Sequence, residues 1–302
     1  MWQTPMNFLA TEMDVKLHKD FLELHALPVE VIHTLLDRAG ELAQRWDERN
    51  MPSTLRGKRV GVIVDDTGWR NTTAFDLGVQ AMGGICAQVP ISLGTRESVE
   101  DLAGYLDNWF DLLVVRTKQL EALQALADAA VAPVINARTR ANHPCETLGD
   151  LAYIKRVKGT LEGLKVVVIA PDANILRSWV EASKVLPIQV VQVYPEAWHF
   201  QDAELLNANF QASEDMAHAL DADVIVTDCW PQNAPYGQLL SYQVSAAFLD
   251  KARDDLLFLP CPPVTRGEEV TADAMPHASC RSREAKAFLL HAQNALMEWA
   301  AL

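Results

Sequence analysis

The sequence has few cysteines and histidines, and none is spaced as metal ligands usually are. Its five cysteines are scattered along 302 residues without a Cys-x-x-Cys pair, and its eight histidines show no His-Glu-x-x-His or similar spacing. A disulfide framework and a zinc site both need such clustering. We therefore expect neither a disulfide framework nor a bound metal.

The chain is also poor in positive charge. Lysine and arginine number 26 against 40 aspartates and glutamates, which gives a formal net charge of −14 at pH 7. Binding to nucleic acid or to an anionic membrane depends on basic clusters that contact phosphates, and no basic run stands out here. The composition argues against both kinds of partner, but it leaves open a small anionic ligand in a local pocket.

Long apolar runs are missing as well. No stretch reaches the ~18 residues that a membrane-spanning helix needs. The first residues, MWQTPMNFLATEMD, have neither the basic start nor the apolar centre of a secretory signal. We expect a cytoplasmic protein.

What the chain does contain is a regular alternation of short β-branched runs and helical patterns. At 302 residues, two domains of about 150 residues each are expected. Runs that are apolar at every position are typical of parallel strands covered on both faces. Each domain should therefore be an α/β unit with a parallel sheet between helices. Strands are expected at 59–64, 84–89, 111–116 and 132–136, and then at 164–170, 188–195, 223–228 and 256–260.

The two units meet at a helical pattern over 143–159, and no low-complexity linker separates them. We place the N-terminal domain at 1–147 and the C-terminal domain at 148–283. The last segment, 284–302, has the pattern of an amphipathic helix and is expected to complete the N-terminal domain. Another amphipathic helix lies within 21–46.

Polar residues gather where the expected strands end, which is where ligands sit in parallel α/β sheets. The turn DDTGWRNTTAF, residues 65–75, follows the first strand and leads into a helix, an arrangement whose backbone N–H groups can hold an anion. Taken singly, each polar residue also has a structural explanation, such as helix capping by Asp228 or a buried thiol at Cys261. The group comprises Arg70, Asn71, Arg116 and His143 in the first unit, and Asn174, Asp228 and Cys261 in the second.

Taken together, the order of these residues is more specific than any one of them. The segments HPCETLGDLAYIK (143–155), LEGLKVVVIAPDANILRS (161–178) and LPCPPVTRGEEV (259–270) follow one another. In this order the chain resembles the aspartate/ornithine carbamoyltransferase family, and its ornithine branch most closely, along nearly its whole length. The resemblance implies two parallel-sheet α/β domains joined by interdomain helices. It also implies transfer of a carbamoyl group from carbamoyl phosphate to the amine of an amino-acid acceptor, without a cofactor.

The resemblance further implies roles for individual residues. On the donor side, Arg70 matches the first arginine of a phosphate-binding turn, Arg116 an arginine that binds phosphate and carbonyl, and His143 a histidine that polarises the carbonyl. On the acceptor side, Asn174 matches a contact to the α-carboxylate and Asp228 a contact to the amino group. Cys261 matches the cysteine of a late His-Cys-Leu-Pro element, so the resemblance places it among both the catalytic and the acceptor-binding residues. The loop 92–98 matches one that completes the site of a neighbouring subunit, which implies a homotrimer.

The donor site departs from the family pattern. Two arginines of the family pattern are replaced here, by Thr72 and Leu289. Because charge-assisted hydrogen bonds contribute roughly 1.5–3 kcal/mol each, carbamoyl phosphate should bind weakly. A carboxylate at 146 would repel a dianionic phosphate unless it is protonated or paired. The altered positions are Gly68, Trp69, Asn71 and Thr72 in the turn, Glu146 for a glutamine, and Leu289 for an arginine in the last helix.

The acceptor site departs as well, because Gln232 and Asn233 stand where the ornithine branch has a Ser-Met-Gly segment. Two interpretations remain open. The protein is a divergent carbamoyltransferase whose acceptor differs from ornithine, or it has lost the use of carbamoyl phosphate and acts on another donor or as a binding or regulatory protein. A nucleotide-dependent oxidoreductase is disfavoured because no Gly-x-Gly-x-x-Gly follows an expected strand.

Overall fold

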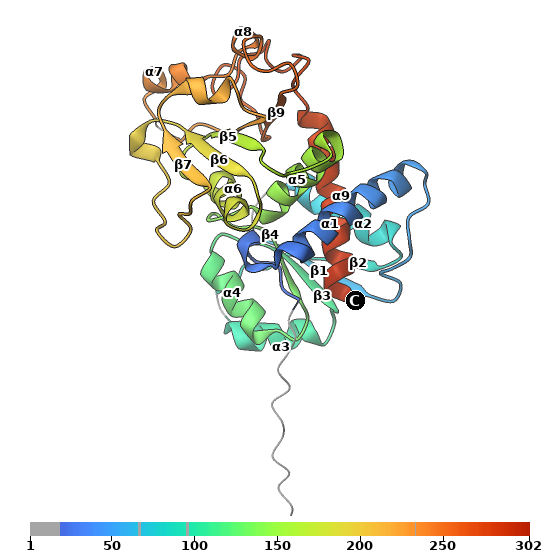
Figure 1. Cartoon of the computed structure of the whole chain (residues 1–302). Helices are drawn as coiled ribbons and strands as arrows, with labels where there is room; N and C mark the ends of the chain where they lie inside the picture. The colour runs from blue at the N-terminus through green and yellow to red at the C-terminus, as the bar shows by residue number, and fades with distance from the viewer. Residues whose placement is uncertain (1–18, 66–67, 95–96, 233) are drawn as a thin grey trace, which may run out of the picture.

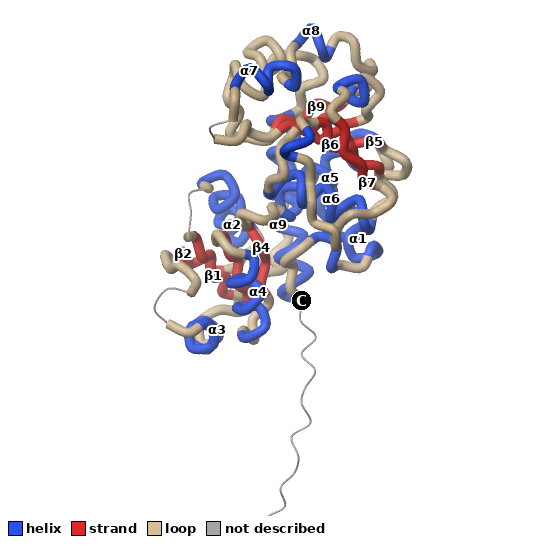
Figure 2. The backbone as a smooth tube through the Cα atoms, turned by 90° about the vertical axis from the view of Figure 1, so that its left-hand side faces the viewer, coloured by secondary structure: helices blue, strands red, loops and turns tan. Residues whose placement is uncertain are grey.

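The structure is a computed structural model that describes residues 19–65, 68–94, 97–232 and 234–302. The described chain forms two lobes, each built on one parallel sheet (Figure 1). Figure 2 shows the same two lobes after a quarter turn, with helices between them. The predicted fold class, two parallel-sheet α/β domains, is confirmed.

The first sheet has four parallel strands in the order β2-β1-β3-β4. Its central strands β1 and β3 are buried along most of their length, as their continuous apolar runs predict. The elements of this lobe are β1 (Arg59–Val64), α2 (Trp69–Ala81), β2 (Ile85–Val89), α3 (Val99–Asp107), β3 (Leu112–Arg116), α4 (Leu120–Ala129) and β4 (Val134–Arg138).

The second sheet has five parallel strands in the order β7-β6-β5-β8-β9. Its edge strand β7 was missed by the sequence analysis, because its four residues are half-exposed or exposed and carry no continuous apolar run. The main elements are β5 (Lys165–Ile169), α6 (Asn174–Val185), β6 (Gln189–Val193), β7 (Phe210–Ser213), β8 (Val224–Thr227) and β9 (Leu257–Pro260).

Short helical turns fill the loops of the described chain. They comprise η1 (Leu24–Ala26), η2 (Glu196–Trp198), η3 (Met216–Ala219), α7 (Tyr236–Leu239), η4 (Leu240–Tyr242) and α8 (Ala246–Leu249). Among the residues that the structure describes, no helix is both long and apolar enough to cross a bilayer.

Three long helices connect the lobes: α1 (Val29–Asp47), α5 (Pro144–Lys158) and α9 (Ser282–Ala301). The last of them packs against α1, α2 and α5, and Figure 1 shows it in red running from β9 down to the first lobe. Side chains of both lobes form one continuous hydrophobic cluster around these helices. The predicted domain boundary at 147/148 falls inside α5, and it stays a prediction.

Helix α5 illustrates how the local sequence sets the connection. Pro144 occupies its first turn, where a missing N–H costs nothing, and Gly159 ends it in the left-handed region with φ 80°. Acidic Glu146 lies near its start and basic residues lie in its last turn, which suits the helix dipole. Every residue from Pro144 to Ile154 is buried, because both lobes cover this part of the helix.

Candidate functional site

A cavity of about 310 Å³ lies beyond the carboxyl ends of strands from both sheets. It brings together ten of the residues singled out in the sequence. They are Gly68, Trp69, Arg70, Asn71, Arg116, His143 and Glu146 from the first half of the chain, and Asn174, Asp228 and Cys261 from the second.

A larger hollow of about 710 Å³ lies elsewhere, where Lys158, Arg253 and Asp255 meet. Its charged side chains are satisfied by one another: Arg253 Nε and Lys158 Nζ lie 2.9 and 3.0 Å from carboxylate oxygens of Asp255. The smaller cavity is the better candidate for a site, because it lies at the strand ends and concentrates buried polar groups there.

The start of helix α2 forms one wall of this cavity. Gly68 caps the helix, and the guanidinium of Arg116, at the end of β3, lies directly over its α-carbon. A Cβ at position 68 would stand 2.4 Å from Cζ of Arg116, closer than any real contact. Arg116 therefore occupies the volume that a side chain at 68 would take, and a residue with a Cβ there would displace the guanidinium.

Trp69 and Arg70 form the outer rim of the same wall. The Trp69 side chain is 68% exposed, and Cζ of Arg70 lies 5.0 Å from the centre of its ring. This distance allows a cation–π contact that holds Arg70 beside the N-terminus of α2. Asn71 is buried, and its Nδ2 donates to the carbonyl of Ala137 at 3.2 Å, which fixes the first turn of the helix against β4.

Glu146 is paired rather than isolated. The ammonium of Lys286, on α9, contacts both carboxylate oxygens of Glu146, and the Glu146 side chain is only 5% exposed. Burial by itself lowers the pKa of Lys286, but Glu146, Cys261 and Asp150 together raise it by more, so the net pKa is raised and the ammonium stays charged. Repulsion of a phosphate by Glu146 is thus offset by a buried cation.

Leu289 occupies a different place from the one its sequence position suggests. It is 2% exposed in the hydrophobic core, with its backbone against Gly149 of α5, and it is not among the described residues that line the cavity. Lys286, about one helical turn earlier on α9, lines the cavity instead. Sequence analysis missed Lys286 because its partner Glu146 lies 140 positions away.

His143 sits between the two lobes at the start of α5. Its backbone N–H donates to Ser178 Oγ at 2.8 Å, which ties it to α6. Burial, and then the positive charges of Lys286, Arg116 and Arg138, hold the pKa of its imidazole well below its usual range. The ring is therefore neutral near pH 7 and can donate one N–H to a carbonyl oxygen. Its Nε2 lies 3.8 Å from Oε2 of Glu146.

The opposite wall comes from the second lobe. Burial raises the pKa of Asp228 to about 6, so its carboxylate is largely ionised at pH 7, and one oxygen accepts from the backbone N–H of Cys229 at 2.8 Å. Burial, together with Glu146 and Asp228, raises the pKa of Cys261 well above its usual range, so this thiol is not a ready nucleophile. The Nδ2 of Asn174 donates to the carbonyl of Thr139 at 3.1 Å.

Two predicted elements of the site are not seen in this cavity. Gln232 is exposed and is not among the described residues that line it. Asn233, and residues 95 and 96 of the loop 92–98, lie outside the described residues.

Arg138 also lines the cavity and was not singled out in the sequence. The first sheet has a bulge at this point: Val115 pairs with Asn136, but Arg116 pairs with Arg138, so Ala137 is an extra residue on β4. Such a bulge redirects the side chain that follows it. The sequence analysis ended this strand at residue 136, before the bulge. It therefore did not predict that Arg138 lies at the strand end and lines the cavity.

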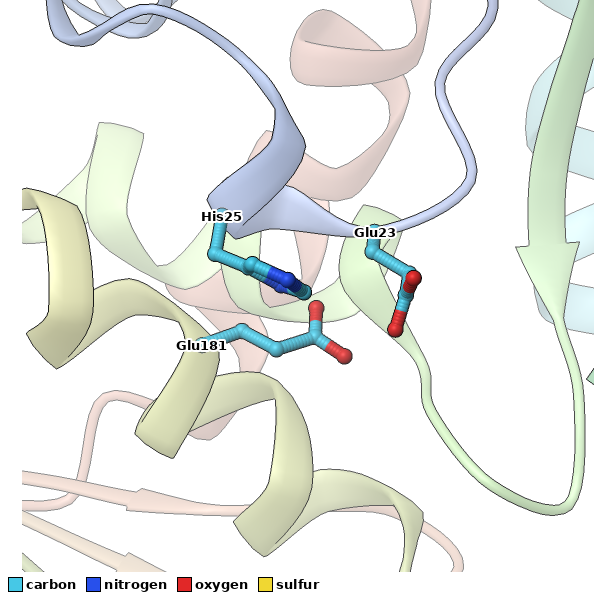
Figure 3. Close-up of side chains that lie close together, drawn as sticks. All are labelled: Glu23, His25 and Glu181. Carbon is cyan, nitrogen blue, oxygen red and sulfur yellow. The ribbon is translucent and has the colours of Figure 1, made fainter. Parts of the chain in front are cut away.

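A separate cluster has the composition of a metal site. The ligand atoms of Glu23, His25 and Glu181 all lie within 4.8 Å of one another, and Figure 3 shows the three side chains meeting between η1 and α6. However, the carboxylate of Glu181 already accepts from the backbone N–H of Leu24 at 2.9 Å, and Arg177 lies 3.2 Å from Glu23 and 3.4 Å from Glu181. The guanidinium of Arg177 supplies the positive charge that a metal ion would otherwise provide. This cluster is therefore an ion-pair network that joins the lobes.

Comparisons with known proteins agree with this architecture. Family models described as aspartate/ornithine carbamoyltransferase match residues 19–156, as the carbamoyl-P binding domain, and 162–300, as the Asp/Orn binding domain. The ornithine carbamoyltransferase of Oceanobacillus iheyensis is 32% identical over 299 residues, covering 92% of this chain and 93% of its own. That of Bacillus subtilis is 32% identical over 300 residues, with 93% of each chain covered.

Solved structures give the same result. The ornithine carbamoyltransferase from Pyrococcus furiosus superimposes with a TM-score of 0.88 at 28% identity, covering 94% of this chain and 97% of that one. That of Thermus thermophilus gives 0.87 at 28% identity, with 95% and 100% covered. The chain belongs to the aspartate/ornithine carbamoyltransferase family.

Proposed function

We propose that the protein transfers a carbamoyl group from carbamoyl phosphate to the amine of an amino-acid acceptor. The observation that carries the proposal is the arrangement of Arg70, Arg116 and the N-terminus of α2 around one end of a cavity, beside a neutral His143 and facing Asp228. These groups suit, in turn, a phosphate, a carbonyl oxygen and an ammonium group.

The donor is held at the first wall. Arg70 and Arg116 neutralise the phosphate, and the first N–H groups of α2 point at it. Because Glu146 is paired with Lys286, its charge adds little repulsion to a phosphate at this position. The Glu146–Lys286 pair supports retention of carbamoyl phosphate as donor, despite the substitutions in the turn.

The chemistry needs positioning and charge stabilisation. An uncharged amine attacks the carbonyl carbon, a C–N bond forms, the C–O bond to phosphate breaks, and the amine proton leaves with phosphate or solvent. Negative charge builds on the carbonyl oxygen, where the neutral imidazole of His143 and the guanidinium of Arg116 can donate hydrogen bonds. Holding both substrates in one cavity supplies the remaining rate advantage.

The acceptor is held at the second wall. Asp228 is proposed to bind the ammonium group of an amino acid, and Cys261 and Asn174 flank it. We also propose a homotrimer in which the loop 92–98 reaches a neighbouring site. Light scattering would test the assembly, and a monomeric mass would exclude it.

Calorimetric titration of carbamoyl phosphate tests the proposal directly. We expect binding to the wild type, and binding roughly 10- to 100-fold weaker for Arg116→Ala because charge-assisted contacts are lost. Arg59→Ala is the matched control, since exposed Arg59 starts the same sheet and pairs with half-buried Asp111, and neither lines the cavity. Wild-type protein that binds no carbamoyl phosphate at millimolar concentration would refute the donor and favour another ligand.

His143→Ala separates chemistry from binding. Loss of the donated hydrogen bond should lower kcat by roughly 10²-fold or more, with a smaller change in carbamoyl phosphate affinity. Unchanged kcat in this variant would remove His143 from the proposed reaction.

A further inference from the structure

The segment that carries His143 is held by a helix of the other lobe. This segment, residues 139–143, joins β4 of the first sheet to α5, whereas α6 belongs to the second lobe. Three side chains of α6 hydrogen-bond to it, those of Asn174, Ser178 and Glu181. Because they are spaced four and three residues apart, they lie on one face of the helix. The histidine is thus attached to the second lobe as well as to its own sheet.

Glu181 holds the residue that precedes the histidine. Its side chain is fully buried, and its two oxygens accept separately: Oε1 from Nδ2 of Asn142 at 3.1 Å, and Oε2 from the backbone N–H of Leu24 at 2.9 Å. From the first lobe, Oδ1 of Asn142 accepts from Nδ2 of Asn136 and Oγ1 of Thr139, both at 2.8 Å. Hydrogen bonds to a carboxylate are stronger than those between neutral groups, so Glu181 anchors Asn142 against α6.

Ser178 holds the backbone of His143 itself. The histidine N–H donates to Oγ of Ser178 at 2.8 Å, and Ser178 is fully buried. By contrast, no other residue that the structure describes hydrogen-bonds to the imidazole ring: Nδ1 is buried without such a partner, and Nε2 lies 3.8 Å from Oε2 of Glu146. The direction of the ring is therefore set through the backbone that the α6 contacts hold.

On the basis of the proposed function, we infer that Ser178 and Glu181 are positioning residues, which hold the backbone at 142–143 and so aim the imidazole of His143 at the donor carbonyl. Neither is among the described residues that line the cavity, so they act through the histidine and not on a substrate. A misplacement of about 1 Å can lower a rate by roughly 10²-fold, so these contacts matter more for kcat than for donor binding. Because α6 begins at Asn174, on the second wall, they also tie the polarising histidine to the lobe that holds the acceptor.

The experiment measures carbamoylation of ornithine, used as a probe acceptor, at saturating carbamoyl phosphate and pH 8. Burial raises the pKa of Glu181 to about 7, so its carboxylate is mostly ionised in this assay. We expect Glu181→Leu to lower kcat by roughly 10- to 100-fold, with the KM for carbamoyl phosphate changed less than about threefold. Glu181→Gln keeps one acceptor oxygen and should lose less kcat than Glu181→Leu. Ser178→Ala should also lower kcat.

Ser183→Ala is the matched control for Ser178→Ala, because both serines are fully buried on the same helix. The Ser183 hydroxyl bonds within the second lobe, where it donates to the carbonyl of Val180 at 2.8 Å and accepts from Nδ2 of Asn207 at 3.1 Å. This variant should keep the wild-type kcat, whatever its melting temperature.

Three results would overturn the inference. They are wild-type kcat in both Glu181→Leu and Ser178→Ala, an equal loss of kcat in Ser183→Ala, and a loss confined to the KM for carbamoyl phosphate. If Glu181→Leu does not fold, Glu181→Gln and Ser178→Ala are judged by the same criteria.

A failure of the proposed function looks different, because the wild type would then not bind carbamoyl phosphate. In that case, or if ornithine is not carbamoylated, the imidazole signals of His143 in ¹⁵N-histidine-labelled protein decide, assigned by comparison with His143→Ala. Displaced signals in Ser178→Ala and Glu181→Leu, but not in Ser183→Ala, support the positioning role. Unchanged signals, or an equal displacement in Ser183→Ala, contradict it.

Discussion

The donor wall and the acceptor wall of the cavity balance their charges in different ways. At the donor wall the buried carboxylate of Glu146 has its own cation, Lys286, built into the protein. At the acceptor wall Asp228 and Arg138 lie near each other and face the same space. The comparison teaches that the charge of Glu146 is offset within the protein by a cation from a distant helix, whereas Asp228 and Arg138 both line the cavity itself.

The largest expected effect comes from breaking the donor-wall pair. Lys286→Met leaves the Glu146 carboxylate buried without its cation, and removal of one partner of a buried pair costs about 3–5 kcal/mol. Urea denaturation should show a loss of this order, and carbamoyl phosphate should bind more weakly because the carboxylate now repels it.

Two further variants test this interpretation. Glu146→Gln combined with Lys286→Met removes both charges and should recover most of the stability. Lys165→Met is the matched control, since Lys165 pairs with Asp221, whose side chain is 72% exposed, and should cost less than about 1 kcal/mol. If Lys286→Met lowered the free energy of unfolding no more than Lys165→Met, Lys286 would not be needed to neutralise the buried carboxylate of Glu146.

A smaller effect follows from filling the space over Gly68. Gly68→Ala places a Cβ 2.4 Å from Cζ of Arg116, so the guanidinium must move away from the helix start. Calorimetry should show carbamoyl phosphate binding roughly 10- to 100-fold weaker, while the melting temperature changes little.

Gly104→Ala is the control, because nothing lies within 4 Å of a Cβ there. Equal carbamoyl phosphate affinity in Gly68→Ala and in the wild type would show that donor binding by Arg116 does not require a glycine at position 68.

The smallest effect is a pH dependence that separates the two walls. The pKa of Asp228 is raised to about 6, so the carboxylate that binds the acceptor ammonium is lost as pH falls through that value. The acceptor KM, calculated for the species with an uncharged attacking amine, should rise by about tenfold for each pH unit below 6. His143, whose pKa lies well below its usual range, remains neutral near pH 6, so kcat should change less.

The Asp228→Asn variant has no carboxylate to titrate at this position, and its acceptor KM, calculated for the species with an uncharged attacking amine, should be higher and nearly flat over the same range. A profile in Asp228→Asn that matches the wild type would assign the titration to another group.

The sequence was sufficient for the fold because parallel strands covered on both faces must be apolar throughout. All eight expected strands are present, and only β7 was missed, since an exposed edge strand has no such requirement. The polar residues at the strand ends were predictable for a related reason: the carboxyl ends of parallel strands meet at one edge. Their individual roles stay predictions.

The sequence by itself determined two parallel α/β units, the connecting helix α5 and ten residues that line one cavity. Only the tertiary structure decided how that cavity is charged. Lys286 reaches Glu146 across 140 positions, Leu289 turns into the core, and a bulge of one residue brings Arg138 beside Arg116. The physical reason is that local patterns fix which face of an element is apolar, whereas charge pairing depends on which distant elements pack together.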